Sequence, residues 1–216
     1  MRKVTPRCIS LCATIVMVAL LIPGNAGAQV GKNLGLLEPN LASKEELQGV
    51  EHIDEALADA IIDGRPYLDI LALDKVLATR LSEAQREATY ARLWTPINLN
   101  TATREEILLI PGVGDRMLHE FEEYRPYVAL AQFHREIGKY VDDEELARLA
   151  QYVFVPVDLN TASEEDILSI PGVGQRMLHE FQEYRPYRAI EQFRREIGKY
   201  VDEDEVARLE RYVTIR

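Results

Sequence analysis

The chain has very few cysteines, and both lie near its beginning. Cys8 and Cys12 are the only two among 216 residues. Residues 29–216 therefore cannot form a disulfide, bind a metal through thiolates or use a cysteine nucleophile. This part of the sequence also has no apolar run of the length that a membrane-spanning helix needs, about 20 residues. A fold built from these residues must depend on its hydrophobic core alone.

Positive charge is scarce as well. The sequence holds 25 Lys and Arg against 36 Asp and Glu, a net charge of −11. Because residues 1–28 contribute three basic and no acidic side chains, residues 29–216 carry a net charge of −14. A surface of this sign does not attract nucleic acid or anionic lipid by its overall charge. Any anion must then be held by a local arrangement of donors.

The first 28 residues have the pattern of an export signal. Three basic residues precede an apolar stretch, Cys8–Ile22, and Ala26-Gly27-Ala28 fits a small-residue cleavage site. As a helix this 15-residue stretch spans about 22 Å, which is short of the roughly 30 Å hydrocarbon core. We therefore expect a signal peptide over 1–28, a short lead segment over 29–36, and a periplasmic or extracellular protein. An uncleaved N-terminal anchor is the alternative.

The main positive feature of the chain is a long internal repeat. Residues 97–156 and 157–216 are identical at 40 of 60 aligned positions. The same period reaches back into 37–96, where an Asn and an Arg-Pro-Tyr sequence recur at the equivalent places. We therefore expect a first unit (37–96), a middle unit (97–156) and a last unit (157–216). Tight joints should pack them on one another, since sixty residues bury only a marginal core.

Each unit is expected to form four short helices. In the middle unit, Thr103 and Glu106 form a capping box at the first helix, and a Pro-Gly-Val-Gly turn at 111–114 precedes the second. Gly138 should end the third helix as a C′ glycine, and Asp142 should cap the fourth, with Glu145 as its box partner. No stretch alternates with period two for long enough to predict a sheet. The predicted fold class is all-α, a tandem array of three units.

The residues Asn100–Gly114 and Asn160–Gly174 resemble the helix-hairpin-helix motif. Both contain Asn-Thr-Ala, an acidic first helix and the Pro-Gly-Val-Gly turn, followed by an amphipathic second helix. The fuller unit is similar to the exported ComEA-type competence DNA receptors and to the PsbU-type lumenal photosystem subunits. The resemblance covers nearly all of 97–216 and, weakly, 37–96. It implies either an exported protein that holds the DNA backbone without reading its sequence, or a structural protein on the same fold.

The turn itself favours an anion site. Glycines can adopt positive φ and leave amides uncovered, and the first amides of the following helix are unsatisfied donors aligned with the helix dipole. Carried over from the family, the residues expected to contact double-stranded DNA are Gly112, Val113, Gly114 and Arg116 in the middle unit, and Gly172, Val173, Gly174, Gln175 and Arg176 in the last unit.

The three turns are not equivalent. Acidic Asp115 follows the middle turn, whereas neutral Gln175 follows the last one, so the last hairpin is the better candidate. The first unit has Glu51-His52-Ile53-Asp54 at this place, which lacks glycine and adds two acids. We expect that copy to be scaffold only.

The sequence offers no catalytic grouping. His119 with Glu123, and His179 with Glu183, are i, i+4 pairs, and two ligands per unit make a weak metal site. We therefore expect neither enzymatic activity nor a cofactor. Basic residues between 185 and 211 are expected to form an ordinary solvated face. The alternative to DNA binding is a scaffold whose acidic helices contact protein partners, which the net charge of −14 favours.

Overall fold

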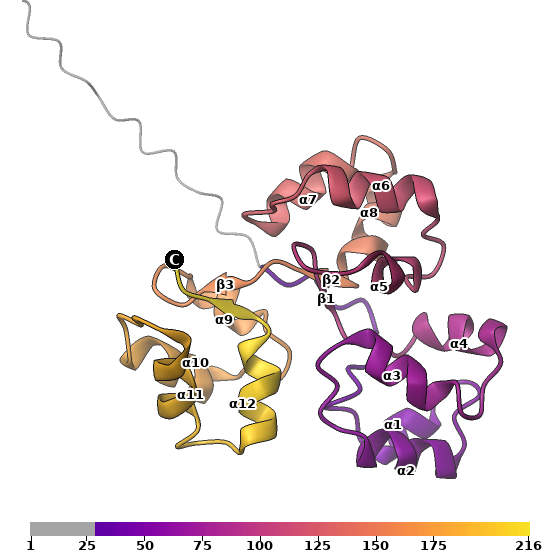
Figure 1. Cartoon of the computed structure of the whole chain (residues 1–216), viewed down its shortest axis with the longest axis horizontal. Coiled ribbons are helices and arrows are strands. Elements are labelled where there is room, and N and C mark those ends of the chain that lie inside the picture. Colours follow the sequence, from indigo (N-terminus) through magenta and orange to yellow (C-terminus); the bar gives the residue numbers. More distant parts are fainter. Residues whose placement is uncertain (1–28) are drawn as a thin grey trace, which may run out of the picture.

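The computed structural model describes residues 29–216 (Figure 1). This part of the chain is mostly helical, as the sequence predicts, with twelve helices and four two-residue strands. The predicted export signal, 1–28, lies outside the described residues. The elements in chain order are α1 (Lys44–Gln48), α2 (Glu55–Asp63), α3 (Ile70–Leu77), α4 (Glu83–Tyr90), β1 (Ile97–Asn98), α5 (Arg104–Leu108), α6 (Asp115–Glu123), α7 (Leu130–Ile137), α8 (Asp143–Ala150), β2 (Val153–Phe154), β3 (Val157–Asp158), α9 (Glu164–Leu168), α10 (Gln175–Glu183), α11 (Ile190–Ile197), α12 (Glu203–Glu210) and β4 (Val213–Thr214).

The first helix of each unit begins at a capping box, as predicted. Ser43, Thr103 and Ser163 each accept a hydrogen bond from the backbone amide three residues later, and the acidic side chain at that position binds the amide of the cap. Asp142 also caps its helix, but Glu145 binds Arg148 instead of closing a box.

The third helix of the middle unit ends at Gly138, as the sequence predicts, but this glycine lacks the left-handed backbone typical of a C′ glycine. Gly138 ends α7 with φ of −60°, which is ordinary right-handed helical backbone. A Cβ at this position would lie 2.6 Å from the His134 carbonyl oxygen and 3.2 Å from Leu146. Lack of space for a side chain therefore explains this glycine better than its backbone angles do.

Side chains that recur at sixty-residue offsets tie the beginning of each unit to the link between its helix pairs. In the middle unit, Arg125 donates from Nε to the Leu99 carbonyl at 2.6 Å and from Nη2 to the Ala102 carbonyl at 2.7 Å. The Asn100 side chain donates to the Tyr127 carbonyl at 2.9 Å and accepts from its amide at 2.6 Å. The other two units repeat this arrangement. These residues recur because the scaffold requires them.

Short parallel strand pairs close the units, which the sequence did not predict. β1 pairs with β2 and β3 with β4, and one bridge joins Leu37 to Leu93 at the equivalent place in the first unit. Strands of two residues are too short to show the alternation that marks a strand in sequence. The pairings bring the beginning and end of each unit side by side.

The lead segment is built into the fold. Val30 forms an antiparallel bridge with Phe154 and is buried in the hydrophobic cluster of the last unit. Gly31 passes so close to α8 that a Cβ there would lie 1.7 Å from the Ala150 carbonyl oxygen. The lead segment thus joins the middle and last units through backbone and side-chain contacts.

The three groups of helices lie around the short strands (Figure 1). Trp94 lies in a core shared by the first and middle units, and its Nε1 donates to the Tyr152 carbonyl at 3.0 Å. Arg211 ties the last unit to the joint between the other two, since its Nη2 donates to the Pro96 carbonyl at 2.7 Å. The hairpin turns are therefore held on a connected scaffold.

Candidate nucleic-acid interface

The first glycine of each Gly-Val-Gly sequence has left-handed backbone. Gly112 and Gly172 have φ of 79° and 80°, and His52 occupies the same place in the first unit with φ of 72°. The turn itself explains these glycines, because residues other than glycine adopt left-handed backbone angles only at a cost in free energy.

The second glycine behaves differently. The expectation of positive φ is wrong here, since Gly114 has φ −110° and ψ −178°, and Gly174 has φ −105° and ψ −176°. Any residue adopts this extended backbone, and Asp54 does so at the equivalent place in the first unit. A Cβ on either glycine would meet no atom within 4 Å. Neither backbone conformation nor space therefore requires a glycine at these two positions.

These two glycines are also poor helix caps. Asp54 begins α2 and accepts a hydrogen bond from the Leu57 amide, whereas Gly114 and Gly174 provide no such bond to α6 and α10. In the described part of the chain, the amides of Gly114 and Asp115 have no hydrogen-bond acceptor. The turn thus leaves donors at a helix N-terminus open to solvent, where an anion is favoured.

The valines of the turn do not contribute donors. The Val113 amide donates to the Ile110 carbonyl at 3.0 Å, and the Val173 amide donates to the Ile170 carbonyl at 3.0 Å. Both side chains are buried. Their amides already close the turn, so the expected contact of Val113 and Val173 with phosphate gains no support and stays a prediction.

Two exposed arginines lie in the first turns of α6 and α10. Arg116 and Arg176 take part in no ion pair among residues 29–216. Gln175 is exposed beside Arg176. The structure therefore brings the predicted cations together with the open amides of each hairpin.

Sequence analysis missed a second arginine behind each turn. Nη2 of Arg148 lies 3.5 Å from the place where a Cβ on Gly112 would lie, and Nη2 of Arg208 lies 3.0 Å from the equivalent place on Gly172. A comparison at the sixty-residue offset could have revealed these arginines. The first unit has Ala88 at the place of Arg148 and His52 at the place of Gly112, so the arginine and the glycine are absent together. Arg148 is bound to Glu145 at 2.6 Å, and this hydrogen bond raises the pKa of Arg148.

The surroundings of the two hairpins differ. A hollow of ≈ 400 Å³ lies between the middle hairpin and α4, which lines it with Glu83, Arg86 and Glu87. Asp115 is almost fully exposed, and its carboxylate lies 3.9 Å from Arg104. At the last hairpin, Leu41 of the first unit lies about as close to Gly172 as Arg208 does. The middle hairpin is thus the more acidic, and the last one the more closely covered by a neighbouring unit.

Apart from Arg176 and Arg208, the basic residues of the last unit do not gather beside its hairpin. Arg185 belongs to the scaffold bonds described above, and Arg211 holds the joint at Pro96. Four more bind acidic neighbours: Arg194 binds Glu210, Arg195 and Lys199 bind Glu196, and Arg208 binds Glu205, whereas exposed Arg188 takes part in no ion pair among residues 29–216. These pairs neutralise most of the positive charge that the sequence suggested.

The histidine pairs are ordinary surface contacts. Nε2 of His119 lies 3.5 Å from the Glu123 carboxylate, and His179 and Glu183 repeat this distance. All four side chains are more than half exposed. Among residues 29–216, no three side chains of the metal-binding types come together.

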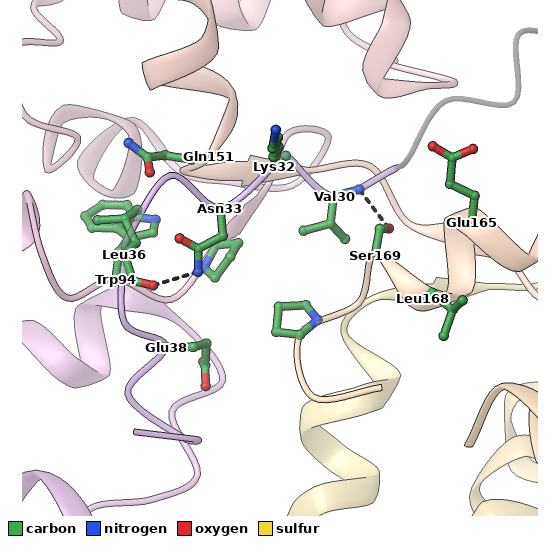
Figure 2. A pocket seen from close by; sticks show the side chains of 13 residues that line it. Val30, Lys32, Asn33, Leu36, Glu38, Trp94, Gln151, Glu165, Leu168 and Ser169 are labelled. Carbon is green, nitrogen blue, oxygen red and sulfur yellow. Dashed lines mark hydrogen bonds between the residues drawn. The ribbon is translucent and has the colours of Figure 1, made fainter. Parts of the chain in front are cut away.

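Another hollow lies beside the lead segment and reaches Pro171 of the last hairpin turn. It has a volume of ≈ 700 Å³ and lies between the lead segment, the joint at Trp94 and Pro96, and the last unit. Figure 2 shows its edge, where the Val30 amide donates to Ser169 Oγ at 3.3 Å. Its charged lining residues are Lys32, Glu38 and Glu165, so acidic side chains outnumber basic ones and an anion is not favoured.

The strained histidine of the first hairpin gives a test of the turn. Replacing His52 by Gly is expected to raise the free energy of unfolding by about 1 kcal/mol, because the left-handed backbone no longer carries a side chain. Urea denaturation followed by circular dichroism measures the change. The reciprocal control, Gly112→Ala in the middle unit, should lower the stability by a similar amount. A less stable His52→Gly variant would show that the imidazole itself stabilises the turn.

Comparison with known proteins adds no relative. No family model matches the chain, and neither a curated protein nor a solved structure matches it. In the described residues, no helix has the length and apolar character needed to cross a membrane. The resemblance to helix-hairpin-helix proteins stays a prediction that rests on the residues of the turns.

Proposed function

We propose that the protein is an exported, non-enzymatic member of the helix-hairpin-helix family that binds double-stranded DNA through its backbone, without sequence preference. It is a tandem array of three units, of which the middle and last bind DNA and the first is scaffold. A role of the ComEA type, in capturing DNA outside the cytoplasm, follows from combining this binding with the predicted export signal.

One observation supports this proposal above the others. Gly114 and Gly174 occupy positions where a side chain would fit and a capping residue would stabilise the helix. The first unit has such a residue, Asp54. A glycine that neither the backbone angles nor the packing requires is expected where another molecule approaches the backbone closely. Open amides and an exposed arginine at the same place suit a phosphate.

The direct test is DNA binding by a charge-reversed variant. Arg116→Glu with Arg176→Glu is expected to weaken binding to a random-sequence duplex by about tenfold or more at low salt, because two phosphate contacts become repulsive. Fluorescence anisotropy across a salt series measures both the affinity and the number of contacts. With two arginines involved, the slope of log K against log salt in the parent should be shallow, about −2.

A matched control separates local contact from overall charge. Lys75→Glu with Arg92→Glu changes the net charge equally, and both of these side chains are exposed on the first unit. This control should bind DNA nearly as well as the parent does. If the two variants lose affinity equally, or if the parent does not bind duplex DNA at all, the hairpins are not the site.

The second candidate function is a scaffold for protein partners. It is favoured by the net charge of −14 and by Glu83 and Glu87 beside the middle hairpin. In that case the duplex assay gives no binding, and basic partner proteins bind with a strong dependence on salt.

A further inference from the structure

A small hollow lies beside the middle hairpin. It has a volume of ≈ 220 Å³ and lies between the hairpin turn, the N-terminal half of α6 and the loop that follows α7. The residues that line it are Gly112, Gly114, Arg116, Met117, Glu120 and Tyr140. One end therefore carries the open backbone and an arginine, and the other end carries a carboxylate and a phenol.

One oxygen of the carboxylate in this hollow has no hydrogen-bond partner among the described residues. Glu120 is only 9% exposed, and its Oε2 has no hydrogen-bond partner within the described chain. A buried carboxylate oxygen without a partner is costly, so it points to a group that is not part of the chain. The neighbouring Tyr140 hydroxyl lies 2.9 Å from the Tyr124 hydroxyl. Hydrogen bonding to Tyr124, and then to Glu120, raises the pKa of Tyr140.

The last unit repeats the arrangement, and the first unit lacks it. Glu180 is 8% exposed with an unpartnered Oε2, and the Tyr184 and Tyr200 hydroxyls lie 2.8 Å apart. In the first unit, Ala60 and Arg80 replace the carboxylate and the phenol. The first unit folds without this carboxylate, so its presence is tied to the glycine hairpins and not to the scaffold.

We propose that Glu120 and Glu180 each bind a divalent cation of the Mg²⁺ type, which bridges the carboxylate to a nucleic-acid phosphate held on the adjacent hairpin. This inference rests on the proposed function. Mg²⁺ is commonly held by one or two carboxylates together with substrate phosphates and water, and not by a complete cage of protein ligands. No such cage exists among residues 29–216, so the phosphate must complete the coordination.

The cation also accounts for the position of the carboxylate. A phosphate bound at the Gly114 amide and Arg116 would lie in the same small hollow as Glu120. The two negative groups would repel each other unless a cation lay between them. A bridging Mg²⁺ turns this repulsion into attraction, and it lets a chain with a net charge of −14 bind a polyanion with few arginines of its own.

The test uses the sign of the Mg²⁺ effect. Anisotropy of a labelled random-sequence duplex is measured with MgCl₂ replacing NaCl at constant ionic strength. Mg²⁺ ordinarily competes with protein cations for phosphate and weakens binding. We expect the opposite for this protein, an affinity that rises by about tenfold, the size of one charge-assisted contact. Hexaamminecobalt(III) should not replace Mg²⁺, because it keeps its ammonia ligands and cannot bind a carboxylate directly.

Two pairs of variants identify the residues. Glu120→Gln with Glu180→Gln should lose the gain from Mg²⁺ while keeping helical content by circular dichroism. Glu123→Gln with Glu183→Gln should keep the gain, since it makes the same change in charge at exposed positions of the same helices. If the first double variant fails to fold, the single variants should each lose part of the gain.

The outcomes separate the two proposals. A parent affinity that falls with Mg²⁺, or a gain that persists in Glu120→Gln with Glu180→Gln, overturns the cation site and leaves the hairpin contact standing. A parent that binds no duplex, with or without Mg²⁺, overturns both.

Discussion

Replacing both Gly114 and Gly174 by Asp is expected to abolish duplex binding without weakening the fold. Each new carboxylate would stand at the open end of its hairpin, where a phosphate is proposed to bind. Because nothing lies within 4 Å of the new Cβ, the scaffold has room for it. Losing both contacts should lower the affinity by about a hundredfold at low salt. The free energy of unfolding should rise by a few tenths of a kcal/mol, because Asp caps a helix better than Gly does.

The uncharged variant separates shape from charge. Asn at positions 114 and 174 has nearly the size of Asp and caps a helix equally well, but it does not repel phosphate. We expect Asn to weaken binding less than Asp does. Anisotropy gives the affinities, and urea denaturation gives the stabilities. If the Asp variant binds duplex DNA as the parent does, the hairpins are not the contact and the proposed function is wrong.

The helices and caps could be read from the sequence because their signals are local. Ser43, Thr103 and Ser163 each stand three residues before an acid, and each begins a helix in the structure. The repeat gave a second kind of information. Comparing Ala88 with Arg148 at the sixty-residue offset could also have indicated the second arginine, although not its distance from Gly112.

The two glycines of each turn could not be told apart from the sequence. Gly112 and Gly114 are the same residue type two positions apart, yet one has left-handed backbone and the other extended. Only the surroundings of each Cα show which glycine the fold requires. The sequence also could not show that the Val113 amide donates to the Ile110 carbonyl within the turn. Predicting the site thus needed the geometry of the turn as well as its composition.

The structure of the lead segment could not be predicted from the sequence. Nothing in residues 29–36 repeats or alternates, so no pattern indicated that they would pair with β2. Their role depends on contacts across more than a hundred positions, such as the 2.9 Å hydrogen bond from the Val155 amide to the Gln29 carbonyl. These contacts fix how the middle and last units are joined, and with them the relation between the two glycine hairpins.

Gly31→Ala is expected to release the lead segment and destabilise the protein by about 3 kcal/mol, measured by urea denaturation. The new Cβ would lie 1.7 Å from the Ala150 carbonyl oxygen, a backbone atom that cannot move aside alone. Releasing the segment exposes Val30 and breaks the hydrogen bond between the Gly31 amide and the Val153 carbonyl. One buried valine and two backbone hydrogen bonds together account for roughly this energy.

The control is Lys32→Ala, since Lys32 is exposed and its change leaves these contacts in place. A loss below about 1 kcal/mol for Gly31→Ala would show that the lead segment adapts to the methyl group. Because two hairpins on one rigid scaffold bind a single duplex more tightly than two independent ones, Gly31→Ala should also lower the affinity for long duplexes. Binding to a duplex too short to reach both hairpins should stay unchanged, since neither site is altered.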